Sequence, residues 1–165
     1  MNIVLLEPEI PHNTGAIGRT CHCTSSRLHL IRPLGFSTDE KHLRRTGLDY
    51  WHELDITYHN SFPEFLVYMS TNTPNARLWI ASTKAAKCYS DVSYGQDDYI
   101  MFGRESSGTP EEILLAHLDG CIRIPMRVGT RSLNLSVSAG IVLYEALRQH
   151  GFYGLSEQGK FGGLS

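Results

Sequence analysis

The chain has 165 residues and a mass of 18.5 kDa, which is the size of one domain. Hydrophobic residues make up 41%, charged residues make up 19%, and the formal charge is −2 at pH 7. These values are typical of a globular protein. They exclude a polybasic protein that coats nucleic acid indiscriminately, but they leave room for a nucleic-acid enzyme with a local basic site.

Short apolar segments alternate with stretches of helical pattern. Strands are expected at 2–6, 27–32, 54–58, 77–81, 99–102 and 121–124. Helices are expected at about 14–24, 39–45, 61–70, 110–117 and 136–149. The alternation predicts an α/β domain with a mainly parallel sheet flanked by helices. The last helix is the clearest, with an apolar face expected at Val137, Ile141, Tyr144 and 146–147.

The four cysteines do not form a common zinc motif. One residue separates Cys21 from Cys23, whereas structural zinc sites favour two or more, so we expect small buried or half-buried thiols and no metal. No apolar signal segment follows Met1, and no window approaches the roughly 20 apolar residues of a membrane span. A cytoplasmic protein with reduced thiols and no membrane association is predicted.

Ligands of open parallel α/β sheets bind beyond the carboxyl ends of the strands, and three of the expected loops there are unusual. In the first, Asn13 or Thr14 is expected to cap a helix, and Arg19 either grips a phosphate or is merely solvated. The second, 103–110, lacks the sequence patterns of phosphate loops, dinucleotide-binding loops and hydrolase nucleophile elbows. We expect it either to contact an adenosine or a ribose or to be a simple connecting loop. The third, 124–136, is a ligand cradle or a capping segment.

Residues in these three loops resemble, in order, the three motifs of the SpoU branch of the SPOUT methyltransferases. The residues are Asn13-Thr14-Gly15 with Arg19, then Phe102-Gly103-x-Glu105-x-x-Gly108, then Ile124-Pro125-Met126 with 131–136 (RSLNLS). The segment 43–50 (LRRTGLDY) is similar to single-domain members that methylate the wobble nucleotide of tRNA. The resemblance covers about residues 1–153, and 154–165 are expected to form a flexible tail.

The resemblance implies a SPOUT fold with a deep trefoil knot at its C-terminal end, a topology that general rules would not predict. It also implies a homodimer with the active site near the subunit interface, and S-adenosyl-L-methionine held in the knot loops. The residues implied to bind this cofactor, largely through backbone groups, are Ala81, Thr83, Gly103, Ile124, Ser132 and Leu133.

The implied reaction is methyl transfer to the 2′-hydroxyl of cytidine or uridine 34 in the tRNA anticodon loop. It needs alignment and removal of a proton but no metal. Arg19 matches the family's catalytic arginine; because an arginine stays protonated, we expect it to orient a phosphate and to ease alkoxide formation. The residues expected to position ribose, cofactor or Arg19 are Asn13, Glu105, Ser132 and Asn134.

Arg44, Arg45 and Arg131 are the candidates for tRNA contact. Tyr144 is assigned to the dimer face or the substrate, with a buried helix aromatic as an equal alternative. Two departures from the family stand out: Ser25-Ser26 replaces a glycine and an aromatic residue, and Arg104 stands where relatives often carry proline. The alternative functions are 2′-O-methylation at another tRNA or rRNA position, and a catalytically silent RNA-binding dimer.

Overall fold

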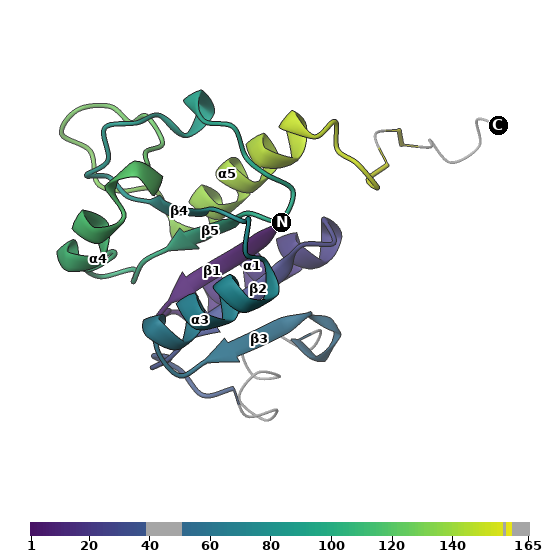
Figure 1. Ribbon diagram of the computed structural model, residues 1–165, viewed down its shortest axis with the longest axis horizontal. Coiled ribbons are helices and arrows are strands. Elements are labelled where there is room, and N and C mark those ends of the chain that lie inside the picture. Colours follow the sequence, from purple (N-terminus) through teal and green to yellow (C-terminus); the bar gives the residue numbers. More distant parts are fainter. Residues whose placement is uncertain (39–50, 157, 160–165) are drawn as a thin grey trace.

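The computed structural model describes residues 1–38, 51–156 and 158–159. The predicted helix at 39–45, Arg44, Arg45 and most of the predicted tail therefore lie outside the described residues. Six parallel strands form one sheet in the order β3-β2-β1-β5-β4-β6 (Figure 1). The strands are β1 (Asn2–Leu6), β2 (Arg27–Ile31), β3 (Ile56–His59), β4 (Leu78–Ala81), β5 (Tyr99–Phe102) and β6 (Cys121–Ile122).

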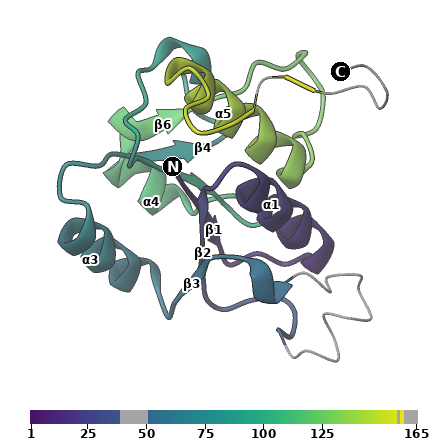
Figure 2. The same ribbon diagram turned by 90° about the vertical axis from the view of Figure 1, so that its right-hand side faces the viewer.

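Helices cover both faces of the sheet (Figure 2). One face packs against α1 (Pro11–Cys23) and α5 (Leu135–Gln149), and the other against α3 (Phe62–Asn72) and α4 (Glu111–Ala116). Short 3₁₀ helices lie at Trp51–Glu53, Tyr89–Asp91 and Leu118–Gly120. Successive side chains of a strand point to opposite faces, so Ile3 and Leu5 contact the first pair of helices while Val4 and Leu6 contact the second. The predicted α/β architecture is confirmed.

Helix α1 begins at Pro11, earlier than predicted, and its N-cap Ile10 makes no side-chain capping bond. Asn13 and Thr14 lie inside the helix, so the prediction that one of them caps it is wrong. Proline is preorganised for the first helical position, where its missing N–H costs nothing. This early start releases the Asn13 side chain for other partners.

The turn between α1 and β2 contains the serine pair that departs from the family pattern. Ser25 has a φ of 52°, the left-handed region that favours glycine. The buried Ser26 accepts a hydrogen bond at its Oγ from Thr24 Oγ1 at 3.0 Å. The turn therefore depends on the backbone conformation of Ser25 and on the hydrogen bond between the Thr24 and Ser26 hydroxyls.

The apolar face predicted for α5 is only partly correct. The buried residues of the helix are Ala139, Val142, Leu143, Ala146 and Leu147. Val137 and Tyr144, spaced two turns apart, are 50% and 47% exposed. The helix thus has two apolar faces, of which one packs on the sheet and the other lies on the surface.

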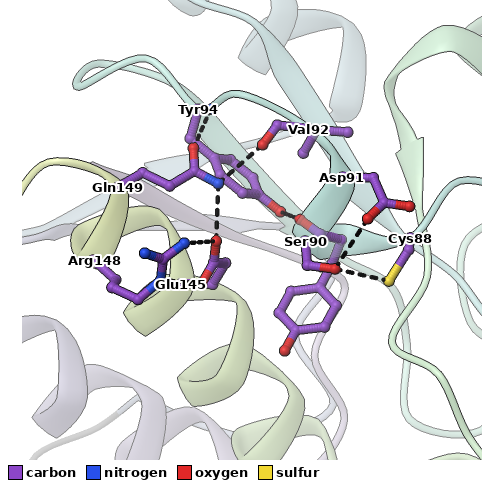
Figure 3. Close-up of polar contacts among 9 residues, drawn as sticks. Cys88, Ser90, Asp91, Val92, Tyr94, Glu145, Arg148 and Gln149 are labelled. Carbon is purple, nitrogen blue, oxygen red and sulfur yellow. Dashed lines mark hydrogen bonds and ion pairs between the residues drawn. The ribbon is translucent and has the colours of Figure 1, made fainter.

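The end of α5 is fastened to the irregular segment that precedes β5 (Figure 3). Gln149 accepts a hydrogen bond from the backbone N–H of Tyr94 at 3.0 Å and donates one to the carbonyl of Val92 at 2.9 Å. Beyond the helix, Phe152 and Leu155 pack against the core. The predicted domain end at residue 153 and the trefoil knot stay predictions.

Candidate active site

A pocket of about 510 Å³ opens at the carboxyl ends of the central strands. Its walls come from the start of α1, from the segments after β4 and β5, and from the connection between β6 and α5. The lining residues include Ile10, Asn13, 81–84, 102–109, Ile124, Met126 and 132–135. This is the edge at which parallel α/β sheets bind their ligands, so all three sequence motifs meet where the loop argument placed them.

Glu105 joins the loop after β5 to the start of α1. Its Oε2 accepts a hydrogen bond from the backbone N–H of Glu9 at 2.8 Å. Its Oε1 accepts from the backbone N–H of Ile10 at 3.3 Å and from Asn13 Nδ2 at 3.1 Å. Hydrogen bonds to an ionised carboxylate are stronger than those between neutral groups. The carboxylate therefore holds the first motif in place.

Asn13 and Asn134 extend this connection to the third motif. Asn134 Nδ2 donates to Asn13 Oδ1 at 3.0 Å, and Asn13 is only 5% exposed. Asn134 Oδ1 also accepts from the backbone N–H of Ser136 at 2.9 Å, which caps the start of α5. We call the chain Glu105–Asn13–Asn134 the carboxamide bridge, because amide side chains carry it from β5 to α5.

Two further carboxylates at this edge were not found from the sequence. Glu7 accepts from Arg104 Nε at 2.9 Å and from its Nη2 at 2.5 Å. Glu9 accepts from the backbone N–H of Ser106 at 2.8 Å and from its Oγ at 2.7 Å, and these bonds lower the pKa of the Glu9 carboxyl. The only sequence signal is their alternate spacing beside Pro8, which is equally typical of a solvated loop.

Gly103 lies under the turn formed by 104–108, and its identity follows from its contacts. A Cβ at this position would overlap the backbone of Gly108 and Thr109 and would lie 2.6 Å from Thr109 Oγ1. Arg104 and Gly108 exchange backbone hydrogen bonds of 3.3 and 2.9 Å, and Gly108 has a φ of 71°. The close turn leaves no room for a side chain on the pocket floor.

The predicted site residues that the structure describes divide into two groups. The structure brings together at the pocket Asn13, Ala81, Thr83, Gly103, Glu105, Ile124, Ser132, Leu133 and Asn134. Arg19, Arg131 and Tyr144 are exposed and are not among the lining residues. The exposure of Tyr144 removes the alternative of a buried helix aromatic.

The cysteines fit the prediction of buried or half-buried thiols only in part. Cys21 and Cys121 are buried and Cys88 is half-buried, but Cys23 is exposed, contrary to the expectation. Among the described residues, no group of three or more His, Cys, Asp or Glu side chains is arranged to hold a metal ion. No helix in the described ranges is long and apolar enough to cross a membrane.

The model of the SpoU rRNA Methylase family matches residues 1–144. The chain belongs to this family. It is 49% identical to the tRNA (cytidine(34)-2'-O)-methyltransferase of Saccharophagus degradans, covering 93% of this chain and 97% of the relative. The resemblance inferred from the three motifs is therefore confirmed.

Solved structures of the family share the fold. One, described as "Structural insights into the 2-OH methylation of C/U34 on tRNA", superimposes with a TM-score of 0.81 at 41% identity, covering 91% of this chain and 95% of that one. The SpoU methyltransferase AviRb from Streptomyces viridochromogenes, in complex with AdoMet, has a TM-score of 0.77 at 22% identity, covering 91% of this chain and 60% of that one.

Proposed function

We propose that this chain is an S-adenosyl-L-methionine-dependent tRNA 2′-O-ribose methyltransferase that acts on cytidine or uridine 34 of the anticodon loop. The observation that carries the proposal is the 49% identity to an enzyme named for this reaction over nearly the full length of both chains. The pocket supports it, since residues of all three motifs line one site. Because tRNA is the substrate, we expect the enzyme to act in the cytoplasm.

The pocket fits S-adenosyl-L-methionine. Its volume of about 510 Å³ falls in the range of small-molecule sites. The absence of a side chain at Gly103, forced by the turn above it, lets a ligand approach the backbone closely. When bound, S-adenosyl-L-methionine supplies an already activated methyl group. The residues we assign to holding it are Ala81, Thr83, Gly103, Ile124, Ser132 and Leu133.

We assign two further roles in the reaction, one to Arg19 and one to the carboxamide bridge. The 2′-hydroxyl must pass its proton to a nearby acceptor, and a guanidinium close to the oxygen lowers the cost of the alkoxide that forms. We assign this role to Arg19, which also orients the substrate phosphate. Asn13, Glu105 and Asn134 are positioning residues, because their hydrogen bonds hold the start of α1, the helix that carries Arg19, against the pocket loops.

A homodimer accounts for the second apolar face of α5. Val137 and Tyr144 are 50% and 47% exposed, and their spacing of seven residues places them on one side of the helix. Leu133, which precedes the helix, is 40% exposed. Ile10, also 44% exposed, lies at the pocket with Leu133. Pairing through this face would bury the apolar side chains and close the pocket rim. We assign Arg44, Arg45 and Arg131 to the tRNA backbone on the family resemblance.

Methylation of unmodified tRNA tests the proposal. The protein is incubated with methyl-labelled S-adenosyl-L-methionine and tRNA, and the label is located by nucleoside mapping. We expect it on the ribose of nucleotide 34. Label at another tRNA position or in rRNA would keep the chemistry but overturn the assigned substrate, and tRNA binding with no ribose methylation would indicate a catalytically silent dimer.

A further inference from the structure

Thr109 carries a buried hydroxyl that no hydrogen bond satisfies among the residues that the structure describes. The residue is 7% exposed and lines the pocket. A desolvated hydroxyl without a partner lowers stability, and native proteins rarely keep one without a reason. We propose that Thr109 is a ligand-binding residue whose hydroxyl forms a hydrogen bond with the nucleoside part of the cofactor. This inference rests on the proposed function and adds a residue that the motifs do not contain.

The surroundings of Thr109 place its hydroxyl against Gly103, a residue that lines the pocket. Gly108, in its left-handed conformation, turns the chain back over Gly103. As a result Thr109 Oγ1 lies 2.6 Å from the point that a Cβ of Gly103 would occupy. The floor therefore includes the bare backbone of Gly103, and the Thr109 hydroxyl, itself shielded from solvent, lies beside it.

The ligand chemistry follows from the contrast between the floor and the rim. Phe102 and Leu114 are 2% and 5% exposed and apolar. The other buried polar side chain of the lining, Asn13, is already hydrogen-bonded to Glu105 and Asn134. Within the described part of the chain, this leaves the Thr109 hydroxyl as the unpaired polar group of the buried lining. The exposed rim carries polar side chains, among them Ser132 and Asn134. A flat heterocycle with hydrogen-bonding edge atoms matches the floor, and a charged amino-acid group matches the rim. We therefore assign Thr109 to the adenosine end.

Rotation about one bond gives the hydroxyl access to a ligand. Thr109 Oγ1 is shielded from solvent, so the exposed part of the residue belongs to its other atoms. Threonine side chains occupy staggered rotamers, and a turn about Cα–Cβ exchanges the hydroxyl with another substituent. In the unliganded protein the hydroxyl rests unpaired; in the complex it turns to the nucleoside.

Two substitutions with two measurements test this assignment. Thr109→Val removes the hydroxyl and keeps the shape, whereas Thr109→Ser keeps the hydroxyl. Thermal unfolding is recorded without ligand, and affinities for S-adenosylhomocysteine and 5′-methylthioadenosine are measured by calorimetry. For Thr109→Val we expect an equal or higher Tm, because an unpaired polar atom is gone, and a roughly 2- to 10-fold weaker affinity, because a ligand hydrogen bond is lost. Thr109→Ser should bind like the parent protein.

5′-Methylthioadenosine lacks the amino-acid group, so it locates the contact. If Thr109 pairs with the nucleoside, both ligands lose affinity by the same factor; a loss confined to S-adenosylhomocysteine overturns the assignment to the adenosine end. Thr73→Val is the matched control, since Thr73 Oγ1 is hydrogen-bonded to the carbonyl of Met69 and to the hydroxyl of Tyr99, and Thr73 is not among the pocket-lining residues. It should lower the Tm and leave both affinities unchanged.

The remaining outcomes overturn the proposal. Unchanged affinity in Thr109→Val means that the hydroxyl never meets the ligand, and a lower Tm means that it is already paired in the unliganded protein. Failure of the unsubstituted protein to bind either ligand would reject the proposed function itself. That result is distinguishable, because the Thr109→Val comparison presupposes normal binding by the parent.

Discussion

The two sides of the pocket differ in how firmly they are held. On one side, the carboxylates of Glu7, Glu9 and Glu105 tie the loop after β5 to the loop after β1. On the other side lies the connection 125–133, whose hydrogen bonds within the described structure join Thr130 to Arg127. Val128 in this connection is 96% exposed. We call these the fixed wall and the open wall.

The two walls therefore differ in how far they are ordered before a ligand binds. The fixed wall is built from charge-assisted bonds to backbone N–H groups, so it keeps its shape without a ligand. The open wall is anchored at its end by Asn134, the last member of the carboxamide bridge. We therefore expect a ligand to meet a preformed fixed wall and to order the open wall.

The largest effect is expected from Arg19, which belongs to neither wall. Arg19→Ala should lower the rate of tRNA methylation by about 100- to 1000-fold, since it removes one charge that stabilises the developing oxyanion. Affinity for S-adenosylhomocysteine should stay close to that of the parent. Single-turnover methylation and calorimetry measure the two quantities. A folded variant with the full rate would show that the assigned role is wrong.

Glu105→Gln breaks the fixed wall. The neutral amide weakens three bonds at once, those from Glu9, Ile10 and Asn13. We expect the free energy of unfolding to fall by about 2–3 kcal/mol, with a lower kcat/KM. Urea unfolding checks this, with Glu112→Gln on the exposed side of α4 as the matched control. Equal stability of both variants would contradict a carboxylate-centred wall.

Asn134 separates the anchoring of the open wall from the capping of α5. Asn134→Ala loses both and should cost about 1 kcal/mol or somewhat more. Asn134→Asp keeps a capping oxygen but cannot donate to Asn13 Oδ1. We expect Asn134→Asp to retain most of the stability and still to methylate more slowly. If the two variants lose activity only in proportion to stability, the link to Asn13 has no part in positioning.

Acid should act outside both walls, on the face of the sheet that α3 covers. His29 and His59 are buried there, with His29 Nδ1 3.1 Å from His59 Nε2. Asn2 Nδ2 donates to a backbone carbonyl, so Asn2 Oδ1 accepts from His29 Nε2. His29 Nδ1 is then an acceptor, and its protonation breaks the bond from His59. Burial lowers the pKa of His29 to about 3 and also lowers the pKa of His59.

The sign follows from these lowered values. Between the unfolded pKa of about 6.5 and the folded value, the unfolded chain binds more protons. The stability that neutral His29 contributes is therefore present above pH 6.5 and is lost as the pH falls, by about 1.4 kcal/mol at pH 5.5. Urea unfolding at pH 7.5 and 5.5 measures the loss. The control is His22→Gln at an exposed position, which should show the same loss of stability between the two pH values. An unfolding free energy that does not change with pH would refute the role assigned to His29.

The smallest expected effect is a difference in the exchange rate of backbone amides, with no change of fold. Backbone amides of 125–133 should exchange with deuterium faster than those of 104–108, because fewer hydrogen bonds protect them. Adding S-adenosylhomocysteine should slow exchange chiefly in the open wall. Equal protection of the two segments before ligand addition would erase the distinction between the walls.

The fold was largely predictable because apolar runs mark every strand, but the buried histidines were not. The alternation in 27–32 suggests a strand with one polar side, which would expose His29. In a parallel sheet covered by helices on both faces, side chains on both sides of a strand can be buried. His29 is fully buried and therefore needs a partner, which His59 of β3 supplies. Which polar residues meet across strands depends on register, which a single sequence does not specify.

The site was predictable in outline and not in its connections. Asn13, Glu105 and Asn134 were found through family motifs, and their spacing of 92 and 121 residues gives no local signal of contact. Glu7 and Glu9 were missed because the sequence does not distinguish a glutamate that binds a neighbouring loop from a glutamate that is exposed to solvent. The unpaired hydroxyl of Thr109 follows from the turn at Gly108, which only three-dimensional packing reveals.

Gln149 has a consequence for the order in which the chain assembles. Its side chain completes the backbone hydrogen bonding of Tyr94 and Val92, which lie 55 and 57 residues earlier. We expect these peptide groups to stay paired with water during synthesis until α5 has been made and docks. Contacts of such long sequence separation form late, so the segment before β5 acquires its native shape only after nearly the whole chain has been made.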